Sequence, residues 1–410
     1  MDREIRVGVF GTGRGEVFAR TAGDAGMQLV ALCDWNEEAL GRVCQRHRSV
    51  ARYADFDAFL QHDMDAVVLA NYFQQHAPYA IRALEAGRHV LSETTACKTL
   101  AEGVALCEAV ERTGHIFMLA ENYPYSAAAC ELRRLYQNGE IGKVRYAEGE
   151  YNHPGETAWW LRLSPGLDHW RNWVPPTYYC THALGPLLHV INEWPVSVNG
   201  QAMIDEGAQS PATTKVCDSG GVMLVRTDGG AVLRIFGLTI GSVHRVRYEF
   251  HGEQGFMGTC DPDHWRWVRV RHEPFQKPRD GTLDRLYAPD WPEHGDLTRK
   301  SGHGGGDFWT NYHFAQAIRA GKQPFFDVYR SVAMAAVGIL GWRSCLEGSR
   351  TFRIPDFRDA AARRAVADDH ASPFAEDRHR EDHLPPSIRG YVPPSEEAIA
   401  FARRIWEGAE

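Results

Sequence analysis

The chain has 410 residues, of which 44% are hydrophobic and 11% aromatic, so it is long enough to bury two hydrophobic cores rather than one. Its formal net charge of −8 and the lack of any run of Lys and Arg argue against a nucleic acid or an anionic membrane as a partner. Its nine cysteines show no C-x-x-C spacing, which argues against a metal site built on them and indicates reduced thiols in a reducing compartment.

The N-terminal segment MDREIRVGVF is charged and then enters a strand at once, unlike a secretory signal or a transit peptide. No apolar run approaches the roughly 18 residues that a membrane-spanning helix needs. We therefore expect a cytoplasmic protein that has no membrane partner.

Short apolar runs alternate with amphipathic helical stretches between residues 5 and 120. The runs are Ile5–Phe10, Leu29–Asp34, Ala66–Ala70, His89–Ser92 and Ile116–Glu121. Continuous apolar strands with intervening helices predict an α/β Rossmann domain, a doubly wound parallel sheet with helices on both faces. Thr99 followed by Glu102 is a capping-box pattern that predicts the start of a helix.

The pattern changes near residue 143 to longer alternating strands, among which Asp228–Gly230 predicts a hairpin turn. These strands predict a second, α+β domain with a large, mostly antiparallel open sheet. Beyond residue 355 the chain is charged and proline-rich and ends in a short helical pattern, which indicates an arm that packs on the protein or at a subunit interface. We predict a Rossmann domain over residues 1–122, a substrate-binding domain over 123–355 and the arm over 356–410.

The first predicted strand runs into the glycine-rich segment GTGRG. Its first two glycines permit the tight turn and the close backbone approach that a pyrophosphate over a helix N-terminus requires. Asp34 closes the second strand about 20 residues later, where a carboxylate accepts ribose hydroxyls and repels a 2′-phosphate, so the pattern favours NAD over NADP. The third glycine position of the usual fingerprint holds Glu16. The residues expected to bind the dinucleotide here are Gly11, Thr12, Gly13, Arg14, Gly15 and Asp34.

The segment ANYFQQHAPYAIRALEAGRHVLSE, followed by AENYPY and a mixed-sheet domain, resembles the Gfo/Idh/MocA family, named after glucose-fructose oxidoreductase, inositol dehydrogenase and rhizopine catabolism. The resemblance covers most of the chain, and it implies that Asn71 and His76 lie along the dinucleotide. It also implies that Glu93 and Thr94 lie by the nicotinamide and Asn122 close to the nicotinamide ribose. Thr94 departs from the family, whose dehydrogenases usually place there a lysine that helps to move the substrate's hydroxyl proton.

Three further segments resemble one branch of the family, the NAD-dependent glycosidases typified by bacterial α-N-acetylgalactosaminidase. WRNWVPPTYYCTHALGPLL is similar to the branch's W-R…Y-P-T-H-G-L-G-P segment, SGHGGGDF to its G-H-G-G-x-D-F stretch, and ENYPY to its E-N-x-x-Y. The turn after the fifth strand of these enzymes also lacks the dehydrogenase lysine. Relative to the D-x-G-x-H helix start of the dehydrogenases, the histidine of this chain, His182, has shifted by three places.

The same match implies the substrate-facing residues and places Tyr125 on the catalytic tyrosine of the branch. The residues that would face the substrate or the nicotinamide are Tyr151, Arg171, Tyr179, Thr181, His182 and His244. The tryptophans in the loop before His182 suit stacking on the C–H faces of a sugar. His244 stands where the galactosaminidases have a substrate-facing tyrosine, and His153 is followed by proline where they have glutamate, so the resemblance does not extend to the identity of the sugar.

The branch implies a redox-neutral cleavage of a glycoside. The sugar gives up a hydride from C3 to NAD, and the resulting ketone makes the C2 proton acidic. After a base removes that proton, the C1 substituent leaves, water adds at C1 and the hydride is returned to C3. We predict that His182 accepts the C3 hydroxyl proton and Tyr125 the C2 proton, each base contributing about 10²–10⁴-fold to the rate.

Two other functions stay open. An NAD-dependent sugar dehydrogenase or epimerising oxidoreductase fits the fold but lacks its lysine. A non-catalytic NAD-sensing regulator needs an intact cofactor crevice but neither Tyr125 nor His182. We expect NAD as the cofactor, no metal, and a small carbohydrate or glycoside as the partner of a homo-oligomer, either a dimer or a tetramer.

Overall fold

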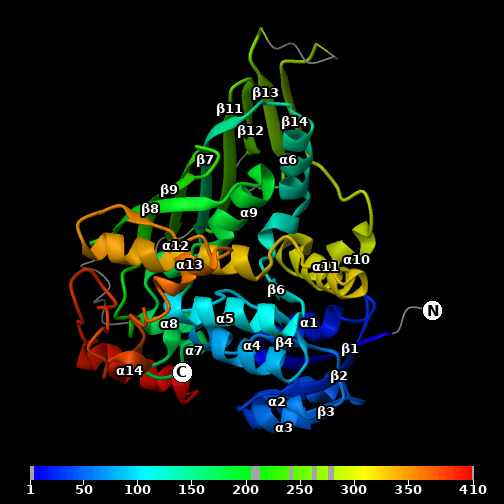
Figure 1. Cartoon of the computed structure of the whole chain (residues 1–410). Helices are drawn as coiled ribbons and strands as arrows, with labels where there is room; N and C mark the ends of the chain where they lie inside the picture. The colour runs from blue at the N-terminus through cyan, green and yellow to red at the C-terminus, as the bar shows by residue number, and fades with distance from the viewer. Residues whose placement is uncertain (1–3, 205–212, 240–242, 261–265, 276–280, 409–410) are drawn as a thin grey trace. The chain divides into compact units, whose positions relative to one another are not determined.

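The computed structural model describes residues 4–204, 213–239, 243–260, 266–275 and 281–408. Its contacts divide the chain into two compact units (Figure 1). Unit 1 comprises residues 1–131, 289–333 and 356–368, and unit 2 comprises residues 132–288, 334–355 and 369–410. These units differ from the contiguous regions expected from the sequence, because residues 289–333 and the first part of the expected C-terminal arm group with the Rossmann strands.

Unit 1 contains a six-stranded sheet in the order β3-β2-β1-β4-β5-β6, in which every strand pair is parallel. Its strands are β1 (Ile5–Phe10), β2 (Met27–Cys33), β3 (Ala51–Tyr53), β4 (Ala66–Leu69), β5 (His89–Ser92) and β6 (Phe117–Leu119). This is the strand order of a Rossmann domain, so the predicted fold of this region is confirmed.

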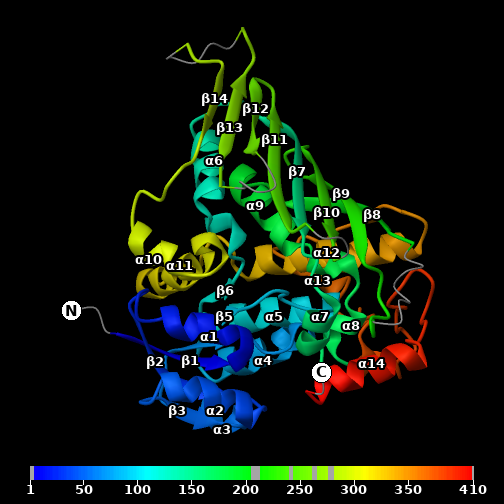
Figure 2. The ribbon, with the colours of Figure 1, turned by 180° about the vertical axis from the view of Figure 1, so that it is seen from behind.

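Helices cover the parallel sheet of unit 1, with α4 and α5 packed against each other in front of the strands in Figure 1 and α1 in front in the reverse view of Figure 2. The helices are α1 (Thr12–Thr21), α2 (Glu37–Arg46), α3 (Phe56–Leu60), η1 (Phe73–Gln75), α4 (His76–Glu85), α5 (Leu100–Thr113), η2 (Tyr123–Tyr125), α10 (Gly295–Arg299), η5 (His303–Gly305), α11 (Gly306–Ala320) and α13 (Ala360–Arg364). The capping box at α5 is confirmed, since the backbone N–H of Glu102 donates to Thr99 Oγ1 at 3.1 Å. Helix α11 packs beside α1, which carries a distant segment to the glycine-rich turn.

Unit 2 contains a nine-stranded sheet in the order β14-β13-β12-β11-β7-β10-β9-β8-β15, antiparallel except where β10 runs parallel to β7. Its strands are β7 (Val144–Asn152), β8 (Pro195–Ala202), β9 (Gly220–Thr227), β10 (Val232–Leu238), β11 (Arg245–Gly252), β12 (Gly255–Thr259), β13 (Val268–His272), β14 (Asp284–Tyr287) and β15 (Phe352–Arg353). The predicted hairpin joins β9 to β10. The predicted mostly antiparallel sheet is therefore confirmed.

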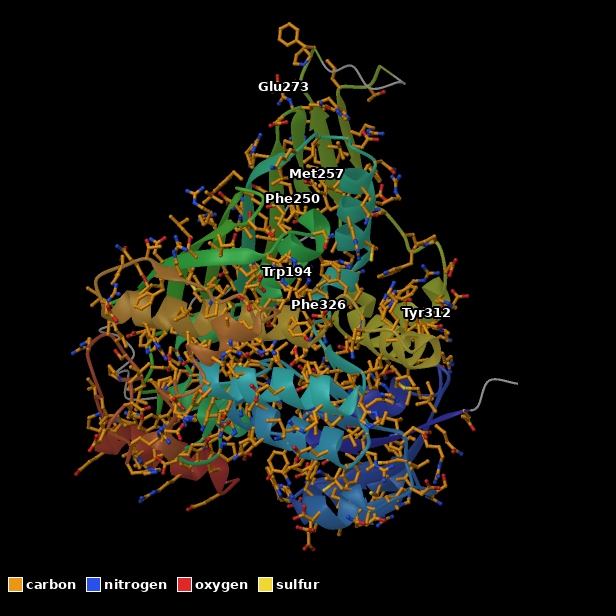
Figure 3. The ribbon with its side chains drawn as sticks, in the orientation of Figure 1. Trp194, Phe250, Met257, Glu273, Tyr312 and Phe326 are labelled. Carbon is orange, nitrogen blue, oxygen red and sulfur yellow. The ribbon has the colours of Figure 1, made fainter. Side chains whose placement is uncertain are left out.

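The core of unit 2 lies between this sheet and helix α9 (Thr181–Ile191), every residue of which is buried. Phe250 and Met257, which are labelled in Figure 3, form a cross-strand pair, and both side chains are fully buried. A Cβ at Gly149 would come within 2.1 Å of the Ala183 carbonyl oxygen, so only glycine lets β7 approach α9 this closely. In the described part of unit 2, the other helices that lie wholly within the unit are α7 (Thr157–Leu163), α8 (Trp170–Trp173), η3 (Pro176–Tyr179), η6 (Ala375–Asp377) and α14 (Glu396–Trp406).

Two helices continue from one unit into the other, α6 (Ala127–Gln137) and α12 (Val328–Leu346). The last described segment, residues 369–408, belongs to unit 2. Helix α14 contacts α7, and the indole N–H of Trp406 donates to the Leu161 carbonyl at 2.9 Å. Among the described residues, no helix is both long enough and apolar enough to cross a bilayer.

Candidate active site

The glycine-rich turn after β1 has the geometry of a phosphate-binding turn. Gly11 has a φ of +91°, and a Cβ there would lie 2.3 Å from the Ala70 carbonyl oxygen. A Cβ built at Gly13 would meet no atom within 4 Å beyond its chain neighbours and its own helix backbone, and the N-cap residue of α1, Gly11, has no side chain that could cap the helix. Apart from the N–H of Thr12, which donates to Asp34, this helix start fits the pyrophosphate of a dinucleotide, because backbone N–H groups at a helix N-terminus bind anions.

Gly15 explains why the glycine fingerprint looks displaced in the sequence. A Cβ at Gly15 would come within 2.6 Å of Val9 Cγ1, so this glycine allows the tight contact of α1 with β1. That contact is the one normally served by the third glycine of the motif. The helix therefore keeps its close packing although Glu16 occupies the usual position.

Asp34 follows β2 at the carboxyl end of the sheet and is fixed by its own chain. Its Oδ2 accepts hydrogen bonds from Thr12 N at 2.6 Å and Thr12 Oγ1 at 2.7 Å, and its Oδ1 accepts one from Asn36 N at 2.9 Å. The carboxylate thus ties the end of β2 to the glycine-rich turn. This position fits the ribose-binding role expected of it.

Asn71 and His76 lie after β4 and differ in their bonding. The side-chain amide of Asn71 is buried, and neither its nitrogen nor its oxygen has a hydrogen-bond partner among the described residues. A buried amide without partners is costly, so it fits a polar ligand such as a dinucleotide. The ring of His76 is almost fully enclosed, with Nδ1 2.9 Å from the Thr95 carbonyl oxygen and Nε2 3.3 Å from that of Asn71. Burial lowers the pKa of His76, and a neutral ring has one N–H, which can donate to only one of these two carbonyls.

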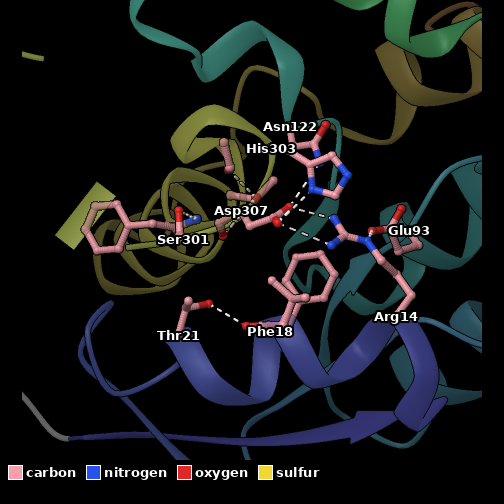
Figure 4. Close-up of polar contacts among 12 residues, drawn as sticks. Arg14, Phe18, Thr21, Glu93, Asn122, Ser301, His303 and Asp307 are labelled. Carbon is pink, nitrogen blue, oxygen red and sulfur yellow. Dashed lines mark hydrogen bonds and ion pairs between the residues drawn. The ribbon is translucent and has the colours of Figure 1, made fainter. Parts of the chain in front are cut away.

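Arg14 connects the glycine-rich turn to the turn after β5 (Figure 4). Its Nε donates to Glu93 Oε1 at 2.7 Å, and its Nη2 donates to Asp307 Oδ1 at 2.6 Å. The other oxygen of Glu93 accepts a hydrogen bond from the backbone N–H of Thr94 at 3.1 Å. Arg14, which follows the first two glycines, therefore fixes the turn that carries Thr94.

Asp307 is the centre of this network and is completely buried (Figure 4). Besides Arg14, it is bonded to His303 Nδ1 at 2.8 Å and to the side-chain nitrogen of Asn122 at 3.0 Å. Burial by itself would raise the pKa of Asp307, but the His303 hydrogen bond and the Arg14 charge together hold it well below its usual range. The carboxylate is thus ionised, and it positions both Arg14 and Asn122.

The glycines of the SGHGGGDF segment bring Asp307 to this place. A Cβ at Gly306 would lie 2.3 Å from the Asn122 carbonyl oxygen, so any side chain would push helix α11 away from η2. Gly305 has a φ of +97°, a left-handed conformation that favours glycine. The run of glycines therefore serves close backbone packing beside a predicted cofactor residue.

Tyr125 ends the short helix η2 and is only 4% exposed. Its ring lies 4.6 Å from that of His313 and 6.1 Å from that of Phe326. The indole N–H of Trp291 donates to the Tyr125 carbonyl at 3.0 Å, which fixes the backbone at this point.

Four predicted substrate-site residues of unit 2 form a cluster of rings. The centroid of the Tyr151 ring lies 4.7 Å from that of His182, 5.9 Å from that of His244 and 6.2 Å from that of Tyr179. His182 is in the first turn of α9, and its carbonyl accepts a hydrogen bond from the buried Tyr248 hydroxyl at 2.8 Å. The strand β7 and the start of α9 thus bring together residues that the sequence match placed on the substrate.

Two family models match the chain. Residues 5–121 match the model of the Gfo/Idh/MocA oxidoreductase family, NAD-binding Rossmann fold, and residues 260–363 match glycosyl hydrolase 109, C-terminal domain. A Gfo/Idh/MocA NAD-binding domain is joined here to a glycosyl hydrolase 109 C-terminal domain. The predicted family and the predicted cofactor, NAD, are both confirmed.

Curated relatives carry the name glycosyl hydrolase family 109 protein. One from Solibacter usitatus is 27% identical over 396 residues, which cover 86% of this chain and 88% of the relative. One from Saccharopolyspora erythraea is 25% identical over 413 residues, which cover 86% of this chain and 83% of the relative.

Solved structures of two dehydrogenases share the fold. Levoglucosan dehydrogenase in complex with NADH and L-sorbose has a TM-score of 0.74 at 18% identity, covering 86% of this chain and all of its own. myo-Inositol 2-dehydrogenase from Lactobacillus plantarum has a TM-score of 0.66, also at 18% identity, with 86% of this chain covered.

The glycosyl hydrolase 109 match includes the segment that supplies Asp307 and His303. Sequence reasoning noted this segment only as a resemblance and gave neither residue a role. A signal was present, because an aspartate after three glycines at a helix start indicates a carboxylate held close to backbone. Tyr125 and Thr94 lie in unit 1, and the cluster around His182 lies in unit 2.

Proposed function

We propose that the protein is an NAD-dependent glycoside hydrolase that cleaves its substrate by transient oxidation at C3. One observation carries the proposal: the SGHGGGDF segment, which belongs to the glycosyl hydrolase 109 match, supplies the carboxylate that holds two predicted cofactor residues, Arg14 and Asn122. The SGHGGGDF segment and the predicted NAD-binding turn therefore belong to one hydrogen-bond network.

Bound NAD would accept the hydride from C3 and later return it. The glycine-rich turn, Asp34 and Asn71 would hold the NAD. We assign to His182 the removal of the C3 hydroxyl proton and its return after water has added at C1. We assign to Tyr125 the removal of the C2 proton that precedes loss of the C1 substituent and, after exchange with solvent, the delivery of a proton to C2 when water adds at C1. Thr94 has no ammonium or imidazole group to exchange a proton at neutral pH, so the C3 proton has to pass through another residue.

Tyr151 is a second candidate for the C2 proton. Its ring lies 4.7 Å from that of His182, so one sugar ring can meet both side chains at neighbouring carbons. Its phenol and the imidazole are held by β7 and α9, which are rigid elements of the same unit. The choice between the two phenols is tested below.

The experiment follows one hydrogen atom. The protein with NAD is incubated in deuterium oxide with a panel of chromogenic glycosides, and the released sugar is read by NMR. We expect deuterium at C2, protium at C3 and no accumulation of NADH. Protium at C2 after full turnover contradicts the mechanism, because direct displacement at C1 by paired carboxylates touches neither hydrogen.

The alternative is an ordinary sugar dehydrogenase, which the fold of the solved relatives favours. A dehydrogenase would leave a ketone and one NADH for each sugar consumed. The same experiment therefore separates the two functions through absorbance of NADH. A regulator that only senses NAD would give neither product.

We further propose that the protein is a cytoplasmic homo-oligomer, a dimer or a tetramer. All nine cysteines are free thiols, and most are buried, which agrees with a reducing compartment. Light scattering of the purified protein measures the oligomeric state, and a monomer at micromolar concentration would contradict the proposal.

A further inference from the structure

The region of unit 2 around His182 continues into a second group of rings and cations. The His153 ring stacks on Trp159 with centroids 5.6 Å apart and planes at 14°, and it lies 5.2 Å from the His244 ring. Trp159 and Trp160 contact each other at 4.9 Å from adjacent positions of α7. We name this group, together with Arg171, Trp170 and Lys215, the cationic cluster.

Two permanent positive charges lie on the tryptophans of the cationic cluster. The guanidinium carbon of Arg171 is 4.3 Å from the Trp170 ring centroid and 6.0 Å from that of Trp160. The ammonium nitrogen of Lys215 is 4.3 Å from the Trp160 ring centroid and 3.2 Å from Thr239 Oγ1. The ring faces hold these cations but leave the charge of the guanidinium without a counter-ion, since Arg171 forms no ion pair within the described parts of the chain.

Two neighbouring histidines, His153 and His169, have lowered pKa values, to which this positive charge contributes. Burial, aided by the charges of His244, His182 and Arg171, lowers the pKa of His153 to about 4. Burial and then the charge of Arg171 lower the pKa of His169 to about 3. Both rings are therefore neutral near pH 7, and the permanent charge of the cluster comes from Arg171 and Lys215.

Buried polar atoms without hydrogen-bond partners complete the cluster. The indole N–H of Trp160 and Nδ1 of His153 are buried, and neither has a hydrogen-bond partner among the described residues. Unpaired buried polar atoms are costly unless a ligand binds them. A guanidinium with a free edge pairs best with a carboxylate or a sulfate, and the tryptophan faces suit the C–H surface of a sugar.

We propose that the glycoside cleaved by this protein carries an anionic group on its sugar ring, a carboxylate or a sulfate ester, which Arg171 and Lys215 bind. This inference rests on the proposed function for the reaction and extends it to the class of substrate. Two departures from the galactosaminidases that the sequence displays lie here: His244 belongs to the cationic cluster, and the proline that stands in place of a glutamate directly follows His153 of the cluster. A different substituent on the sugar accounts for both.

The first test compares matched 4-nitrophenyl glycosides with the full chain and NAD: the neutral hexosides, the corresponding uronides and the 6-sulfated hexosides. We expect kcat/KM for the uronide or the sulfate to exceed that of the neutral sugar by at least about tenfold, the effect of one charged hydrogen bond. Raising the salt concentration should reduce this ratio. The uronide and sulfate arms distinguish the two sources of negative charge.

Variants test whether Arg171 and Lys215 cause the preference for anionic glycosides. Lys215→Met and Arg171→Gln should each lower the acidic-to-neutral ratio of kcat/KM. Lys143→Met is the control, because Lys143 is exposed and precedes the opposite end of β7, so it should leave the ratio unchanged. A ratio that survives both cluster variants overturns the assignment of these cations.

The second test needs no turnover. Calorimetry without NAD measures binding of glucuronate, galacturonate, glucose 6-sulfate and galactose 6-sulfate against glucose and galactose. Tighter binding of the anions that Lys215→Met abolishes supports the inference even if no glycoside is cleaved, in which case the proposed function alone fails. Cleavage of neutral glycosides with equal binding of neutral and anionic sugars overturns the inference and leaves the proposed function standing.

Discussion

The two units each contain a cluster of polar side chains. The clusters differ in whether their charged groups and donors have ion-pair or hydrogen-bond partners among the described residues. In unit 1, Arg14 is bonded to Glu93 and Asp307, and Asp307 accepts from three side chains. In unit 2, Arg171 rests on tryptophan rings with no ion pair in the described residues, and the Trp160 N–H lacks an acceptor. A satisfied cluster holds backbone in place, whereas a cluster with unused donors is suited to receive a ligand.

The largest expected effect is on the rate, in the unit that receives the sugar. His182→Ala should lower kcat by about 10²–10⁴-fold, because the C3 hydroxyl loses its base. NAD affinity, measured by calorimetry, should be unchanged. The control is His251→Ala, which alters a half-exposed histidine on β11. A wild-type rate in His182→Ala would remove this residue from the mechanism.

The two phenols can be distinguished by the fate of the C2 proton. Tyr125→Phe should lower kcat by about 10²–10⁴-fold and slow C2 exchange to the same extent. Tyr151→Phe should mainly raise KM, since we assign Tyr151 to substrate contact. The reverse pattern, with exchange lost only in Tyr151→Phe, would transfer the base to unit 2.

The next largest effect is expected from removing the charge of Asp307 from the hydrogen-bond network of unit 1. Asp307→Asn leaves Arg14 with Glu93 as its remaining carboxylate partner, and the lost charged hydrogen bonds should cost about 1.5–3 kcal/mol of the free energy of unfolding in urea and weaken NAD binding. The control is Asp290→Asn, which removes an exposed Arg299 pair and should cost less than about 1 kcal/mol. An equal loss in both variants would mean that burial does not strengthen the network.

The same variant should change the pH dependence of stability. The folded pKa of Asp307 is depressed, so its contribution to stability is present above its unfolded pKa near 4 and is lost as pH falls below that value. The wild type should therefore lose more stability than Asp307→Asn between pH 5 and pH 3.

A smaller effect is expected at the ribose end of the cofactor site. Asp34→Ala should weaken NAD binding by roughly 10–100-fold, the effect of losing hydrogen bonds to a charged group, and should reduce the preference for NAD over NADP. Because Asp34 also holds Thr12, the NAD-to-NADP ratio is the diagnostic measurement. Equal affinity of the wild type for both cofactors would contradict the role of the carboxylate.

The smallest effect concerns His153 in the unsatisfied cluster. Its folded pKa of about 4 lies below its unfolded value near 6.5. As pH falls through this interval the unfolded chain takes up a proton on His153 while the folded chain does not, so the free energy of unfolding decreases. His153→Gln should lose less stability than the wild type between pH 7 and pH 5 in urea titrations. Parallel curves for the two proteins would mean that the ring is charged without penalty.

Local patterns in the sequence predicted much of the fold. β1 begins and ends at the predicted residues, and the capping box of α5 and the β9–β10 hairpin formed as expected, because each depends on neighbours in the chain. The assignment of residues 289–333 to unit 1 could not be predicted in this way. It depends on contacts of α11 with α1, which no local pattern specifies.

In the candidate site, too, local sequence patterns predicted some residues, whereas contacts between distant segments were not predictable. Gly11, Gly13 and Asp34 follow from the spacing of a strand, a turn and a second strand. The roles given to Tyr125 and His182 rest on similarity to known enzymes and stay predictions. The link from Arg14 to Asp307 spans 293 residues and is specified by packing, so the sequence displayed both residues but not their pairing.

The length of that link has a consequence for the order of events during synthesis. At about 5–20 residues per second, a ribosome needs roughly 15–60 s after making Arg14 before it reaches Asp307. When the ribosome reaches Asp307, all the strands of the Rossmann sheet, the last of which ends at Leu119, have been made, but Arg14 and Asn122 still lack the carboxylate that later bonds to both. The cofactor-binding turn of the nascent chain therefore acquires its final bonding only after most of unit 2 has been made.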